Sequence, residues 1–75
     1  CKELDIIIGE FAKKHLSELK DEDLIDYFKL LAVDDVSLYN WLTAKELIPE
    51  EFNTFTMQKL FNFCNNTKLY KTLNV

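Results

Sequence analysis

The sequence predicts an all-α protein, a small single-domain bundle of about five short helices. Apolar residues recur at intervals of three and four positions along most of the 75 residues, which is the spacing of one helix face. One glycine and one proline supply few of the turn residues that hairpins and short strands require. A chain of this length has room for one core, so residues 1–75 are expected to form one domain.

The composition excludes several classes of protein. Hydrophobic residues make up 48% of the chain and charged residues 29%, which is too apolar for a disordered protein. No apolar run approaches the roughly 20 residues that span a bilayer, so no membrane association is expected. Thirteen acids and nine lysines, with no arginine, give a net charge of −4. Surfaces that bind nucleic acid need clustered basic residues and often use arginine. This charge therefore argues against nucleic-acid binding.

The first predicted helix covers residues 2–15. Its apolar side chains share one face at helical spacing and are Leu4, Ile7, Ile8 and Phe11, followed by His15. Gly9 lies inside this helix, where glycine costs about 1 kcal/mol relative to alanine. The glycine either marks a close contact with a neighbouring helix or is simply tolerated.

The second predicted helix begins in the run Lys20-Asp21-Glu22-Asp23, whose three acids complement the positive end of a helix dipole. It extends to about Val33. Its apolar positions are expected to be Leu24, Phe28 and Leu31, which are four and three residues apart, flanked by Ile25 and Tyr27.

The third predicted helix is short and covers about residues 36–44. Asp34 and Asp35 precede it and offer carboxylate oxygens that can cap its first turn. Leu38, Trp41 and Leu42 form its apolar stripe, with Trp41 as the large anchor of a small core.

Pro49 predicts one further helical turn, because proline has no amide hydrogen to lose in a first turn. This turn is expected to end near Phe52. Asn53 or Thr54 can then cap a last long helix, with a weaker pattern after Asn65. The expected face of that helix is Met57, Leu60, Phe61 and Cys64. A loose final segment is expected to dock through Leu69, Tyr70 and Leu73.

The sequence offers no set of residues for catalysis or for a metal. His15 is the only histidine and lies on an apolar helix face, which favours a structural role. Cys1 and Cys64 lack ligand-type neighbours at zinc-binding spacing, and two free thiols in a reducing compartment are expected, with one disulfide between them as the alternative. One glycine cannot form a glycine-rich phosphate loop. We therefore expect a binding module and not an enzyme.

Two stretches carry a resemblance to a known family. The first is Glu3-Leu4-Asp5-Ile6 with Phe11 and His15. The second runs from Leu30 to Phe52 and contains the acidic pair, Asn40-Trp41-Leu42-Thr43 and the proline-glutamate turn. Through these residues the chain, over about residues 1–64, resembles the SdhE-type FAD assembly factors. This family is also known as succinate dehydrogenase assembly factor 2 and, in some bacteria, as antitoxin CptB.

The resemblance implies a five-helix bundle that acts as an assembly chaperone. Such proteins bind the flavoprotein subunit of succinate dehydrogenase or fumarate reductase and promote covalent attachment of FAD to it. FAD is then the cofactor of the client, and the chaperone itself holds no cofactor firmly. A free monomer is expected, in the bacterial cytoplasm or, in a eukaryote, in the mitochondrial matrix. An antitoxin or regulator of the CptB type is the alternative.

The resemblance also implies partner-binding residues. Members carry an Arg-Gly-x-x-Glu motif at the start of the first helix, and here Cys1 and Lys2 occupy the two variable positions and Glu3 supplies the glutamate. The arginine and glycine are expected in a short segment before Cys1. Glu3 is thus an expected client contact, although an acid in a first turn also favours the helix dipole. Asp34 and Asp35 are capping acids first and client contacts second.

Overall fold

The computed structural model describes residues 2–67, which form six helical segments and the loops between them. Four are α-helices: α1 (Lys2–His15), α2 (Asp21–Leu31), α3 (Asp35–Leu42) and α4 (Phe55–Thr67). Two are short 3-10 helices, η1 (Leu16–Glu18) and η2 (Glu50–Phe52). The all-α prediction is confirmed: four of the segments are α-helices, and the single helical turn predicted between Pro49 and Phe52 forms the 3-10 helix η2. Cys1 and the predicted final segment with Leu69, Tyr70 and Leu73 lie outside the described residues.

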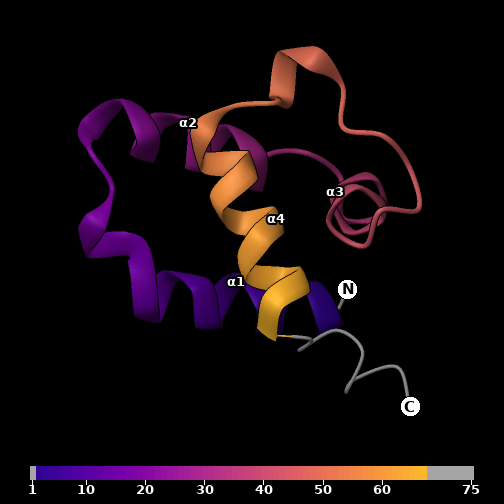
Figure 1. Cartoon of the computed structure of the whole chain (residues 1–75), viewed down its shortest axis with the longest axis horizontal. Helices are drawn as coiled ribbons and strands as arrows, with labels where there is room; N and C mark the ends of the chain where they lie inside the picture. The colour runs from indigo at the N-terminus through magenta and orange to yellow at the C-terminus, as the bar shows by residue number, and fades with distance from the viewer. Residues whose placement is uncertain (1, 68–75) are drawn as a thin grey trace.

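The helix α4 is the centre of the packing. It contacts α1, α2 and α3, and Figure 1 shows it crossing the middle of the molecule in front of α1 and α2. Its buried side chains are Thr56, Met57, Leu60, Phe63 and Cys64. Phe61, predicted for this face, is only half-buried, whereas Phe63 is buried and was not predicted.

Hydrogen bonds fix both ends of α4. The Thr54 hydroxyl oxygen accepts a bond from the Met57 amide at 3.1 Å, which confirms one of the two predicted caps. Near the other end, the Asn65 side-chain amide donates to the carbonyl oxygens of Leu42 at 3.0 Å and Phe61 at 2.8 Å. The first of these bonds ties α4 to the end of α3.

The helix α1 follows the prediction closely. Leu4, Ile7 and Phe11 are buried, and His15 is half-buried at the last position. A Cβ added at Gly9 would meet no atom within 4 Å, so no neighbouring helix requires a glycine there. Of the two readings of Gly9, the structure favours simple tolerance.

The face of α2 that packs on the bundle does not coincide with the apolar positions Leu24, Phe28 and Leu31. Tyr27 and Leu30 are buried, Leu24 is half-buried, and Phe28 and Leu31 are exposed. Of these three positions, only Leu24 therefore packs against the core.

Two long-range hydrogen bonds help to set this rotation of α2. The buried Thr56 hydroxyl on α4 donates to the Asp23 carbonyl oxygen at 3.0 Å. The Tyr27 hydroxyl donates to the Ile8 carbonyl oxygen on α1 at 3.4 Å. Because residues 23, 27 and 30 share one helix face, these contacts turn Phe28 and Leu31 away from α4.

The helix α3 buries the stripe that its sequence predicts. Leu38, Trp41 and Leu42 are buried, and the Trp41 and Phe52 ring centroids lie 5.2 Å apart. After the helix, Ala44 adopts a left-handed conformation with φ of 63°. The Lys45 amide donates to the Asn40 carbonyl at 2.8 Å, which completes a Schellman-type ending.

Candidate functional site

The predicted partner-binding acids occupy two different elements. Glu3 lies in the first turn of α1, where its side chain is half-buried. Asp34 and Asp35 lie together at the start of α3, and both are exposed. The structure thus brings the two aspartates together and places Glu3 on a separate helix.

Asp34 caps α3, as its sequence position predicts. Its Oδ2 accepts a hydrogen bond from the Ser37 amide at 3.0 Å. The bonds from Ser37 favour the ionised carboxylate and lower the pKa of Asp34 from its ordinary value. Asp34 is therefore held as an anion in a fixed orientation on the protein surface.

An exposed apolar stripe precedes these aspartates. Phe28 is 62% exposed and Ile25 is 56% exposed, and Leu31 and Val36 are exposed as well. Ile25, Phe28 and Leu31 lie on α2, and we call these three side chains the α2 surface; Val36 lies beyond Asp34 and Asp35, in the first turn of α3. Sequence reasoning missed the α2 surface because Phe28 and Leu31 have the spacing of a core face, and only the packing of α4 against Tyr27 and Leu30 distinguishes the two faces.

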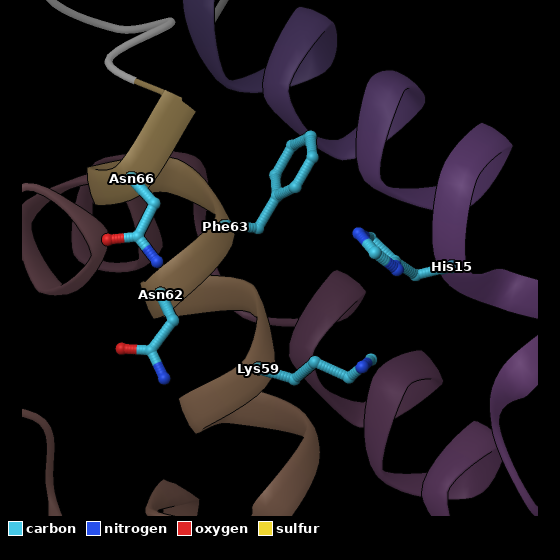
Figure 2. A pocket seen from close by; sticks show the side chains of 5 residues that line it. All are labelled: His15, Lys59, Asn62, Phe63 and Asn66. Carbon is cyan, nitrogen blue, oxygen red and sulfur yellow. The ribbon is translucent and has the colours of Figure 1, made fainter.

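A second surface feature is a hollow of about 360 Å³ between the end of α1 and one face of α4. Its lining residues are His15, Lys59, Asn62, Phe63 and Asn66. Figure 2 shows the His15 ring pointing from α1 toward α4, while the two asparagine side chains come from successive turns of α4. The lining of the hollow thus combines two amide side chains, one lysine, one histidine and one phenylalanine.

Side-chain contacts join His15 to η1 and to α4. His15 Nδ1 and Glu18 Oε1 lie 2.6 Å apart, and this hydrogen bond lowers the pKa of Glu18. The His15 and Phe63 rings meet edge to face with centroids 5.5 Å apart, and Lys14 Nζ lies 5.7 Å from the Phe63 centroid. His15 thus has a structural role in joining α1, η1 and α4, as its place on an apolar face predicted.

The other candidate reactive group is a buried cysteine. Cys64 is a free thiol in the core, and burial raises its pKa to about 11. A thiol of this kind stays protonated at neutral pH and is a poor nucleophile and metal ligand. Within residues 2–67, no group of three or more histidine, cysteine and acidic side chains is placed to hold a metal ion.

Comparison with known proteins gives the family. The model of the family named Sdh5, described as flavinator of succinate dehydrogenase, matches residues 1–64. The chain belongs to this family. The matched span covers both the start of α1 and the α2–α3 region. It therefore contains all three of the predicted contact residues.

Individual members of the flavinator family are similar over most of the chain. The mitochondrial succinate dehydrogenase assembly factor 2 of Dictyostelium discoideum is 34% identical over 89% of this chain, and assembly factor 2-A of Drosophila willistoni is 32% identical over 88%. The FAD assembly factor SdhE of Photorhabdus laumondii is 37% identical over 89%. The matches span 48%, 43% and 75% of those three relatives, so the chain spans somewhat less than half the length of the two mitochondrial ones.

Two further findings concern solved structures and membrane-spanning helices. No solved structure matches this flavinator-family chain. Among the helices formed by residues 2–67, none has the length and apolar character needed to cross a membrane.

Proposed function

We propose that this protein is an assembly factor that binds the flavoprotein subunit of succinate dehydrogenase, or of fumarate reductase, and promotes covalent attachment of FAD to that subunit. The match to the flavinator family over residues 1–64 carries this proposal. The relatives named as assembly factors in both mitochondria and a bacterium support it. The protein would work in the bacterial cytoplasm or, in a eukaryote, in the mitochondrial matrix, as a monomer when free.

The chain acts in this proposal by binding and not by catalysis. Holding the client so that the flavin and its attachment site meet gives a proximity effect, which needs no reactive group on the chaperone. The protonated Cys64 thiol agrees with this role, because a buried thiol with a raised pKa is a poor nucleophile. FAD remains the cofactor of the client.

Glu3, Asp34 and Asp35 are the proposed client contacts. Glu3 is half-buried in the first turn of α1, and this position restricts the conformational freedom of its side chain. Asp34 is oriented by its bond to Ser37. Carboxylates held in place lose less side-chain entropy when they bind basic groups of a partner.

Co-expression with the flavoprotein subunit tests the function. The wild-type protein is expected to increase covalent flavin fluorescence of the client on a denaturing gel. A Glu3→Gln variant is expected to lower this gain, because it loses the charge and keeps the shape of the side chain. Asp5→Asn is the matched control, since Asp5 is an exposed acid in the same helical turn.

Two results would count against the proposal in different ways. No gain in flavin fluorescence with the wild-type protein would contradict the function itself. A gain with Glu3→Gln equal to that of the wild type and of Asp5→Asn would remove Glu3 from the contact surface.

A further inference from the structure

We propose that the α2 surface binds a segment of the flavoprotein client that carries apolar side chains flanked by basic ones. This inference rests on the proposed function and extends the contact region from Asp34 and Asp35 back along α2. Three features of the described residues support it: the exposure of the apolar side chains, the charges at both ends of the stripe, and the way these charges oppose pairing with a second copy.

The exposure of the α2 surface is concentrated on one element. Single exposed apolar side chains are common on proteins and need no explanation. Here Ile25, Phe28 and Leu31 are spaced three residues apart and lie on adjoining parts of one helix face, and all three are exposed. Val36 at 70% exposure follows at the start of α3. A run of this kind, with an aromatic ring at its centre, is typical of a protein interaction site.

Acidic side chains lie at both ends of the stripe. Asp21 and Glu22 are exposed in the first turn of α2, and Asp34 and Asp35 are exposed after its end. Lys29 is the single base between residues 21 and 36, a stretch that contains six acids. The complementary partner therefore has basic groups at each end of an apolar stretch, since like charges at these positions would repel it.

The same charges argue against a second copy of this chain as the occupant. If two α2 surfaces met in an antiparallel arrangement, the acids at residues 21 and 22 would face those at 34 and 35. In a parallel arrangement each acidic pair would face its own copy. Both arrangements place like charges together next to an apolar contact, where low solvent access strengthens the repulsion. A basic partner removes this conflict.

Affinity for the purified flavoprotein subunit, measured by isothermal titration calorimetry, tests the inference. Phe28→Ala is expected to raise the dissociation constant about tenfold or more, as truncation of a central aromatic contact does. Leu47→Ala is the matched control, because Leu47 is 95% exposed but lies in the loop after α3. The control is expected to bind as the wild type does, and thermal melts should show all three proteins folded.

A charge variant tests the second part of the inference. Asp21→Lys is expected to weaken binding several-fold at low salt, and the loss should shrink as salt screens the charges. Glu51→Lys is its control, since Glu51 is also an exposed acid in the first turn of a helical segment. Asp21 and Phe28 are both outside the residues that the family resemblance implies, so these variants test the α2 surface itself.

The outcomes separate this inference from the proposed function. Wild-type binding that is unaffected by Phe28→Ala would overturn the inference and leave the function standing. No binding by the wild-type protein would overturn both. A dimer in sedimentation experiments that is lost in Phe28→Ala but kept in Leu47→Ala would assign the surface to a second copy and overturn the inference.

Discussion

The helices α2 and α3 follow one another in the chain, yet they use their apolar residues differently. The buried side chains of α3 are the ones with the expected spacing, Leu38, Trp41 and Leu42. On α2, Tyr27 and Leu30 are buried while Ile25, Phe28 and Leu31 remain exposed. Both helices pack on α4, but α2 carries more apolar side chains than α4 covers. The side chains that α4 leaves exposed form the α2 surface, for which we propose a binding role.

The sharpest test of this contrast removes one large aromatic side chain from each helix. Trp41→Ala is expected to lower the free energy of unfolding by about 3 to 5 kcal/mol, because it leaves a cavity in the core. Phe28→Ala is expected to change it by no more than about 0.5 kcal/mol, since the ring is 62% exposed. Thermal and chemical unfolding followed by circular dichroism would measure both.

The contrast would fail in either of two ways. A Trp41→Ala melting temperature within a few degrees of the wild type would show that Trp41 is not a core anchor. A loss with Phe28→Ala comparable to that of Trp41→Ala would show that the ring of Phe28 is part of the fold and not of a binding surface.

The same two helices show how far sequence reasoning reaches for the fold. Start positions were predictable because they depend on local chemistry. The helix α2 begins at Asp21, within the predicted run of residues 20–23, and α3 begins at Asp35, one residue before the predicted start. The buried stripe of α3 was predictable because only one face of that helix carries three large apolar side chains. On α2 the apolar residues cover two adjoining faces, and the choice depends on bonds to Thr56 and Ile8, which are distant in the sequence.

The candidate site divides in the same way. The position of Asp34 before the apolar stripe of α3 predicted that it caps this helix. The structure adds the hydrogen bond from the Ser37 amide, which orients the Asp34 carboxylate. The α2 surface could not be read, because an exposed Phe28 and a buried Phe28 give the same spacing. The hollow beside His15 combines α1 with α4, whose Lys59 and Phe63 are more than 40 residues away in the chain. Its formation depends on tertiary packing alone.

A smaller effect is expected where the two helices end. Ala44 follows α3 with a φ of 63°, a conformation that costs a residue with a Cβ about 1 to 2 kcal/mol. Glycine avoids this cost but has more entropy in the unfolded chain, so Ala44→Gly is expected to raise the free energy of unfolding by about 0.5 to 1 kcal/mol. Ala32 at the end of α2 has a φ of −85°. Ala32→Gly is therefore the matched control and is expected to destabilise the protein; a gain in melting temperature for both variants would contradict the backbone explanation.

The smallest expected effect is a pH dependence at the junction between the helices. The bonds from Ser37 lower the pKa of Asp34 below its ordinary value of 3.8, so the folded protein binds a proton there less readily than the unfolded chain. The stabilisation from this carboxylate is fully present above the unfolded value and is lost as the pH falls through the lower folded value. The melting-temperature advantage of the wild type over Asp34→Ala should accordingly shrink below pH 4.

Asp34→Asn separates the charge from the hydrogen bond. Asparagine caps a helix about as well as aspartate but does not titrate, so its advantage over Asp34→Ala should persist at low pH. Melting temperatures of the wild type, Asp34→Asn and Asp34→Ala between pH 2 and pH 7 would give both trends. If the wild type and Asp34→Asn lose stability in parallel over this range, the loss of stability at low pH is due to other carboxylates. The cap would then act on α3 through its geometry alone, as the uncharged contacts at the end of the same helix do.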